Sequence, residues 1–117
     1  MACLSHPLIV RSALARLDGR AGEPVTIPEL CDAAGVSERT LRNAFHDVYG
    51  LSPKQFLIRD GLERVHQALL DAHDARGAVT RAATDCGFFE LGRFARTYRH
   101  VFGECPSETV RAAVSHL

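Results

Sequence analysis

This 117-residue sequence lacks an excess of charge of either sign, because 14 Lys and Arg residues balance 14 Asp and Glu residues. A nucleic-acid-binding domain more often carries a basic excess, so the balance counts against that class of function. The kind of basic residue points the other way. Thirteen of the 14 are Arg, the side chain best suited to bidentate contact with guanine or phosphate. Where these arginines lie therefore matters more than their sum.

Aromatic residues are also scarce, at 7% of the chain, and tryptophan is absent. Alanine and leucine supply much of the apolar content, which favours closely packed helices over a β-sandwich. The length suits one compact domain and is too short for two independent domains of ordinary size. We expect an all-α chain that forms a single unit over residues 1–117.

Metal-ligand, catalytic and membrane patterns are missing as well. Cys3, Cys31, Cys86 and Cys105 lie far apart without a C-x-x-C pair, and we interpret them as small buried hydrophobic residues. The six histidines show neither HxH nor HExxH spacing, which argues against a metal site. The sequence also has no Gly-rich nucleophile elbow or phosphate loop that would support catalysis by a Cys–His pair. We expect no metal, no cofactor and no enzyme. No apolar run reaches the length of a membrane span, so we expect a cytoplasmic protein without a membrane partner.

Apolar residues recur at helical spacing along most of the chain, between residues typical of helix caps and stops. The pattern predicts about seven helices. The expected elements are a helix at 7–17, one at 27–35, one capped by Ser37, a longest helix of about twenty residues within 54–75, a short helix capped by Thr80, one from Glu90 and one capped by Ser107.

The chain repeats itself after 52 or 53 residues. Each copy holds a short helix, a glycine turn, a longer helix and a Gly-x-x-Pro stop. The residues that return are Ile27, Leu30, Cys31, Gly35, Val36, Leu41, Phe45, Gly50 and Pro53, which reappear as Val79, Ala82, Ala83, Gly87, Phe88, Phe94, Tyr98, Gly103 and Pro106.

This order of parts is that of a helix-turn-helix unit. A small residue in the first helix, Cys31 or Ala83, lets the second helix cross closely, and glycine permits the sharp turn. Two apolar residues one turn apart anchor the second helix, whose other face is free to enter a major groove of DNA. We predict two homeodomain-like helix-turn-helix subdomains at 7–53 and 76–117, joined by a connecting helix at 54–75.

At these residues the chain resembles the DNA-binding domain of the AraC/XylS family of bacterial transcription regulators. The resemblance covers about residues 25–112. Its motifs are Gly35-Val36-Ser37-Glu38-Arg39-Thr40-Leu41 with Phe45, Gly50, Ser52, Pro53 and Phe56 in the first copy, and Gly87-Phe88, Leu91-Gly92-Arg93-Phe94, Tyr98-Arg99, Phe102-Gly103-Glu104 and Pro106-Ser107-Glu108-Thr109 in the second.

The resemblance implies sequence-specific binding of double-stranded DNA, with the two recognition helices in adjacent major-groove segments. One chain would then cover an asymmetric site as a monomer in the nucleoid, because a connecting helix of about 30 Å nearly matches one turn of DNA, about 34 Å. The base contacts carried over are Arg39, Thr40, Arg42, Asn43, Gly92, Arg93 and Arg96, and the phosphate contacts are Ser37, His46, Lys54 and Arg99.

Several alternatives stay open. The same exposed helix faces would suit a helical protein-interaction module, which the zero net charge favours. Arg99 could pair with Glu108 instead of a phosphate, and Gly61 stands where the family often has Arg, which would soften the connecting helix. RNA polymerase and an effector or dimerisation domain outside this chain are further partners that the resemblance implies. About 25 residues precede the first copy, which suits either a fragment of a longer regulator or a small stand-alone one.

Overall fold

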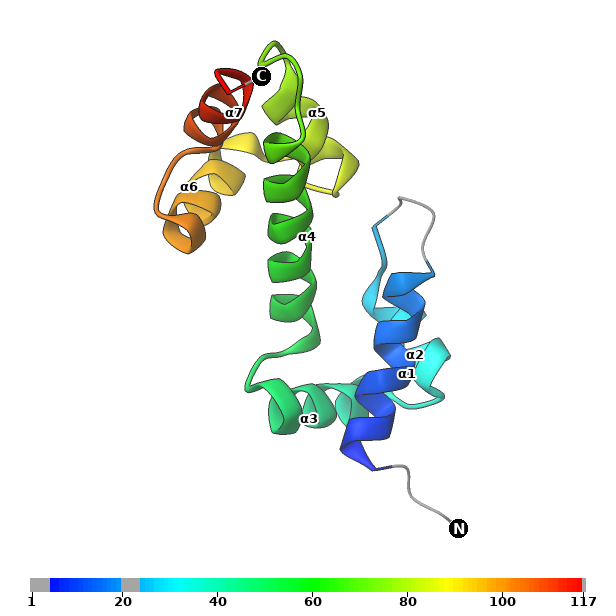
Figure 1. The fold of residues 1–117 in the computed structure, drawn as a ribbon. Helices are drawn as coiled ribbons and strands as arrows, with labels where there is room; N and C mark the ends of the chain where they lie inside the picture. Colours follow the sequence, from blue (N-terminus) through cyan, green and yellow to red (C-terminus); the bar gives the residue numbers. More distant parts are fainter. Residues whose placement is uncertain (1–4, 20–23, 117) are drawn as a thin grey trace. The chain divides into compact units, whose positions relative to one another are not determined.

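The computed structural model describes residues 5–19 and 24–116, and within these ranges it contains seven α-helices and no strand (Figure 1). The predicted all-α fold is therefore confirmed. The helices are α1 (His6–Asp18), α2 (Ile27–Ala34), α3 (Glu38–Tyr49), α4 (Pro53–Leu70), α5 (Ala78–Asp85), α6 (Leu91–Phe102) and α7 (Pro106–Val114).

Two compact units divide the chain between Arg59 and Asp60. The first holds α1, α2, α3 and the start of α4, and the second holds the rest of α4 with α5, α6 and α7. The expected single unit 1–117 and the subdomain limits 7–53, 54–75 and 76–117 stay predictions.

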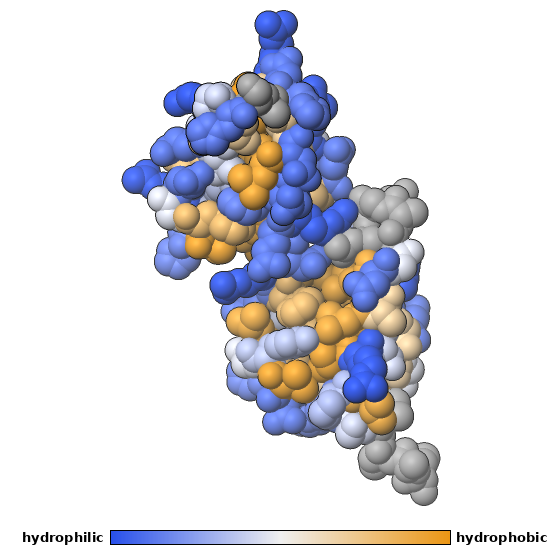
Figure 2. All heavy atoms as spheres, viewed as in Figure 1, coloured by the Kyte–Doolittle hydropathy of each residue, from blue (hydrophilic) through white to orange (hydrophobic). Residues whose placement is uncertain are grey.

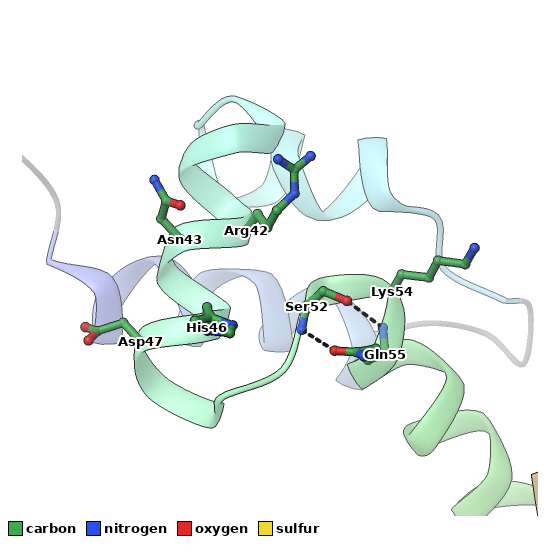
Figure 3. A pocket seen from close by; sticks show the side chains of 7 residues that line it. All are labelled: Arg42, Asn43, His46, Asp47, Ser52, Lys54 and Gln55. Carbon is green, nitrogen blue, oxygen red and sulfur yellow. Dashed lines mark hydrogen bonds between the residues drawn. The ribbon is translucent and has the colours of Figure 1, made fainter.

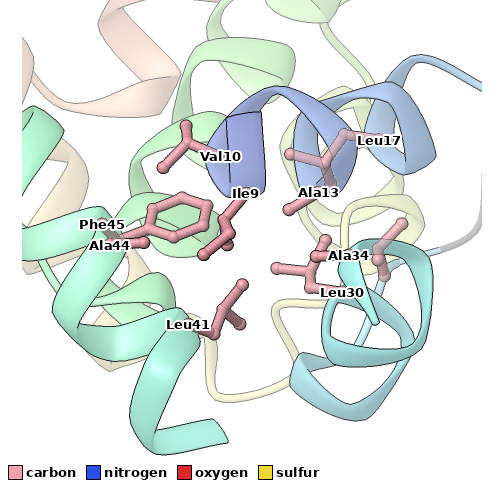
Figure 4. Close-up of a cluster of buried hydrophobic side chains, with 10 residues drawn as sticks. Ile9, Val10, Ala13, Leu17, Leu30, Ala34, Leu41, Ala44 and Phe45 are labelled. Atoms are coloured by element: carbon pink, nitrogen blue, oxygen red, sulfur yellow. The ribbon is translucent and has the colours of Figure 1, made fainter. Parts of the chain in front are cut away.

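In the first unit, α1 packs against both helices of the helix-turn-helix pair. The Ser5 side chain accepts a hydrogen bond from the Leu8 N–H and so caps α1, and a proline lies in the first turn of this helix. The enclosed core is apolar throughout and close-packed (Figure 4). Leu30, Leu41 and Phe45 are fully buried in it, and each such side chain contributes about 1.5–3 kcal/mol by leaving water.

The second unit builds its core from α4, α5, α6 and α7 around Tyr98, which is fully buried. The Tyr98 hydroxyl donates to Thr109 Oγ1 at 2.8 Å, and Thr109 donates to the Glu104 carboxylate. Because that carboxylate only accepts, the direction of the chain is fixed, and His66 Nδ1–H must donate to the Tyr98 oxygen, 2.8 Å away. The His66 ring stacks on Phe102 at 4.3 Å between centroids. This polar chain ties α4, α6 and α7 together.

Each helix-turn-helix turn depends on a glycine with a left-handed backbone, as predicted. Gly35 has φ 69° and Gly87 has φ 90°, a region that costs other residues about 1–2 kcal/mol. The next N–H turns back to the first helix in both units, with Val36 N bonded to the Cys31 carbonyl and Phe88 N to the Ala83 carbonyl. The two turns therefore have the same local structure.

Gly61, the departure noted in the sequence, lies under the second turn. A Cβ added at Gly61 would stand 3.0 Å from the Phe88 ring, closer than ordinary van der Waals contact. Glycine here lets the Phe88 ring approach α4, where it also packs 5.0 Å from the Phe94 ring. The expected softening of α4 is thus accompanied by a packing role for this glycine.

The longest helix ends at Leu70, within the predicted range 54–75, and the Asp74 carboxylate accepts the Arg76 N–H in the turn that follows. Two predicted helix caps need correction. Gly77, with φ 67°, is the N-cap residue of α5, and the predicted cap Thr80 lies inside the helix.

Cys105 is the N-cap residue of α7 in place of Ser107, because Pro106 suits the first helical position and the Glu108 carboxylate accepts the Cys105 N–H at 3.3 Å.

The cysteines are less buried than expected. Cys31, Cys86 and Cys105 are each only half-buried, while Cys3 lies outside the described residues. Small side chains at helix crossings need not be enclosed, and alanine does the enclosed packing here, at Ala44 and Ala83. Among the described residues, no helix is long and apolar enough to cross a membrane.

Candidate nucleic-acid interface

The first recognition helix, α3, has one face in the core and one in solvent. Leu41 and Phe45 are fully buried, whereas Arg39, Arg42 and Asn43 are exposed on the other side. The Ser37 hydroxyl accepts the Thr40 N–H at 3.2 Å and lies 3.1 Å from the Thr40 hydroxyl. Ser37 is therefore the helix cap that the sequence predicted, and it holds Thr40 at the start of the exposed face.

A hollow beside α3 gathers residues of both predicted classes (Figure 3). Arg42 and Asn43, expected to contact bases, line it together with His46 and Lys54, expected to contact phosphates. Its edge is fixed by a reciprocal cap at the start of α4. Ser52 N–H donates to Gln55 Oε1 at 2.9 Å, and Gln55 N–H donates to Ser52 Oγ at 3.1 Å.

The second recognition helix, α6, divides in the same way. Phe94 and Tyr98 face the core, and Arg93, Arg96 and Arg99 are exposed at three-residue intervals. Gly92 has no heavy atom within 4 Å of the place its Cβ would take, so the backbone of the first turn is open to a close neighbour. The seven residues expected to contact bases therefore all lie on α3 or α6, away from the cores.

Each recognition helix also carries an ion pair at its start. Arg42 Nη2 lies 3.5 Å from Glu38 Oε1, and Arg93 Nε lies 3.4 Å from Glu90 Oε2. In the described part of the chain, Arg39 and Arg96 make no ion pair within 4 Å. Sequence reasoning named the arginines and missed their acidic partners, although the i,i+4 and i,i+3 spacings were visible.

Sequence reasoning also missed the apolar start of α6. The Phe89 side chain, in the turn before the helix, is 76% exposed, and the Leu91 side chain is 38% exposed. Leu91 is the first residue of the helix and has no helical turn before it to cover it. Exposed apolar side chains at the start of a recognition helix are of the kind that contacts thymine methyl groups.

Arg99 remains compatible with both of its proposed roles. It is exposed and makes no ion pair within 4 Å among the described residues. The pKa of Glu108 is lowered mainly by its hydrogen bonds with Cys105, and the positive charge of Arg99 lowers it further. Arg99 therefore acts on Glu108 through its positive charge, and no ion pair between the two side chains holds the guanidinium in place.

Within the described ranges, no group of three or more His, Cys, Asp or Glu side chains is arranged to hold a metal ion. The absence of a metal site is an expectation from the cysteine and histidine spacing, and it stays one.

Comparison with known proteins agrees with this geometry. The helix-turn-helix domain family matches residues 30–112. A probable AraC family transcriptional regulator from Rhodopseudomonas palustris has a crystal structure that superposes with a TM-score of 0.75, at 39% identity over 90% of this chain and 96% of that one. The chain belongs to the AraC family of transcriptional regulators. A second AraC-type structure, from Chromobacterium violaceum, has a TM-score of 0.78 at 24% identity over 92% of each chain and supports the fold.

Curated relatives of this AraC-type DNA-binding domain are longer proteins. The probable thc operon regulatory protein of Rhodococcus erythropolis is 36% identical over 90% of this chain and 32% of its own length. The XylDLEGF operon transcriptional activator of Pseudomonas putida is 38% identical over 74% of this chain and 27% of its own length. The chain thus spans about a third of these relatives or less. Its membership confirms the family predicted from the sequence and places it among transcription regulators, not enzymes.

Proposed function

We propose that this AraC-type domain binds double-stranded DNA as a monomer, with α3 and α6 in two major-groove segments of one asymmetric site. The observation that carries the proposal is the division of both helices into a buried apolar face and an exposed face rich in Arg. The exposed residues differ between the helices, so the two segments should have different sequences and a fixed order.

Residue roles follow from position on the two helices. The proposed base contacts are Arg39, Thr40, Arg42, Asn43, Gly92, Arg93 and Arg96, and the proposed phosphate contacts are Ser37, His46, Lys54 and Arg99. The shared hollow supports the assignment in the first unit, because a base contact such as Arg42 and a phosphate contact such as Lys54 line the same space.

The length of α4 bears on the spacing of the site. Its 18 residues correspond to about 27 Å at 1.5 Å per residue, whereas one turn of DNA is about 34 Å. The DNA should therefore bend by a few tens of degrees, at a cost of a few kcal/mol, to bring both groove segments to one chain. Selection of duplexes from a random pool, followed by footprinting and mass measurement of the complex, tests the proposal. A palindromic footprint with two bound chains would contradict binding as a monomer. Protection of a single groove segment would show that only one of the two units contacts DNA.

The protein that contains this domain should regulate transcription from the cytoplasm, with RNA polymerase and an effector or dimerisation domain as its further partners. Regulatory roles of two longer relatives support this, since one is named as an operon regulator and one as an operon activator. The rival function is a protein-interaction module, which the balanced charge favours. A random duplex titrated at low salt separates the two, because an interaction module would show no salt-dependent binding.

A further inference from the structure

The two ion pairs on the recognition helices are unlike ordinary stabilising contacts. All four side chains are largely exposed: 65% for Glu38, 57% for Arg42, 73% for Glu90 and 76% for Arg93. Exposed pairs at these spacings add little to stability. Their value for folding is therefore small, and their position on the groove-facing helices calls for another explanation.

A carboxylate at this place opposes DNA binding in general. DNA attracts arginine mainly through its phosphates, whatever the sequence, and repels a carboxylate in the same way. Glu38 also lines a small hollow with Arg42, a proposed base contact, and Lys54, a proposed phosphate contact, so in the first unit the acid stands beside both kinds of contact. In the second unit, Glu90 occupies the N-cap position of α6 without making a side-chain capping bond, and its carboxylate pairs with Arg93.

We infer that Glu38 and Glu90 are specificity-determining residues, each of which keeps its arginine from phosphates and releases it to a base pair step that satisfies both side chains. This inference rests on the proposed DNA binding. The step must offer guanine O6 and N7 to the arginine, and an amino group to the carboxylate. Cytosine N4 supplies that donor, and adenine N6 is the other amino group in the major groove.

The inference also accounts for the balanced charge of α3. On α3, the acids Glu38 and Asp47 offset Arg39 and Arg42, so the helix as a whole carries no net charge. The consequence is weak attraction to random DNA. A base pair step that accepts from the arginine and donates to the carboxylate restores affinity through hydrogen bonds to both side chains. The low net charge of α3 then contributes to discrimination between sequences, because it weakens binding to random DNA.

The test replaces each acid by its neutral isostere, Glu38→Gln and Glu90→Gln, in the 117-residue chain. Binding to a random duplex and to the selected duplex is measured over a series of salt concentrations. Each replacement should strengthen random binding at low salt by about threefold to tenfold and steepen its log–log salt slope by about one, because one arginine becomes available to a phosphate. Binding to the selected duplex should not gain, so the ratio of selected to random affinity falls.

The matched control is Glu63→Gln, which removes the same charge from an exposed residue of α4. It should leave both the salt slope and the affinity ratio as in the parent. Equal changes in all three variants, or an unchanged ratio in Glu38→Gln and Glu90→Gln, would overturn the inference while leaving DNA binding intact. Failure of the parent to bind either duplex would instead overturn both this inference and the proposed function.

A second readout uses base preference. Selection from a random pool with Glu90→Gln should lose the preference for cytosine or adenine at one position and keep the guanine preference set by Arg93. Loss of the guanine preference alone would show that Glu90 only positions Arg93 and makes no base contact, which contradicts the inference.

Discussion

The two helix-turn-helix units share the same order of helices and turns, and they differ in the side chains that form their cores and surfaces. The first core is apolar throughout, whereas the second encloses the hydrogen-bonded chain from His66 to Glu104. Their surfaces differ as well: in the view of Figure 2, hydrophobic side chains gather over the first unit, and the second is more hydrophilic. A repeated fold thus tolerates different interiors, provided that the turn glycine and the two anchors of the second helix are kept.

Equivalent positions on the recognition helices carry different chemistry. With the offset of 53 residues, Arg39 corresponds to Gly92 and Asn43 to Arg96. An Asn suits adenine and an Arg suits guanine, so the proposed base contacts differ between the two helices. The comparison therefore supports the proposed asymmetric DNA site.

The largest expected effect tests whether the two cores are independent. Phe45 is fully buried, with its ring 5.4 Å from that of Phe56, and no residue of its cluster belongs to the second core. Phe45→Ala should cost about 3–5 kcal/mol of stability by leaving a cavity. Hydrogen exchange should show lost protection in α1, α2 and α3 and less change in α6 and α7. Uniform loss would mean that the units unfold together.

The next effect concerns the polar chain of the second core. Tyr98→Phe removes the hydroxyl that accepts from His66 and donates to Thr109. We expect a loss of about 1–3 kcal/mol, since buried partners are left unsatisfied. Urea unfolding measures it, with Tyr49→Phe as the control in the first unit, where the tyrosine is 44% exposed and the change should stay within about 0.5 kcal/mol. Equal effects would remove the distinction between the cores.

Base contacts provide the third comparison. Arg39→Ala and Arg96→Ala should each weaken binding to the selected duplex by about 1–3 kcal/mol, and each should relax preference in a different half of the site. The control is Arg11→Ala, an exposed residue of α1. Equal losses on selected and random DNA would assign the residue to phosphate contact, and a lack of effect of both Arg39→Ala and Arg42→Ala would show that the first unit does not read bases.

Features that depend on residues close together in the sequence were predictable, and features that depend on side-chain rotamers or spatial neighbours were not. Helical periodicity and the glycine turns depend on local backbone preferences, so the helix-turn-helix units, Gly35, Gly87 and the buried anchors were predictable. The start of α7 was not, because a thiol is an uncommon helix cap and Ser107 is a better one on propensity alone. Ion pairs such as Glu90–Arg93 and the exposure of Phe89 depend on rotamers and neighbours that a periodic pattern does not contain.

The smallest expected effect compares two equivalent helix caps. Ser52 and Gln55 cap α4 reciprocally, and Cys105 and Glu108 occupy the corresponding positions at α7. Hydrogen bonds with the Cys105 thiol and N–H lower the pKa of Glu108 below its ordinary value. A lowered folded-state pKa means that the stability from this group is present above the unfolded value, about 4.3, and is lost as pH falls through the folded value.

Glu108→Gln should therefore flatten the stability of the second unit with pH below about 4.3, while leaving it little changed at neutral pH, where the neutral side chain can still accept the Cys105 N–H. Gln55→Glu is the mirror variant and should introduce an acid-dependent loss in the first unit. Thermal unfolding from pH 3 to pH 7, followed by signals from each unit, measures both. The effect is small because Glu108 is exposed and screened by water. Parallel pH curves for the parent and Glu108→Gln would mean that this cap does not couple folding to protonation, and the two caps would then not differ in their response to acid.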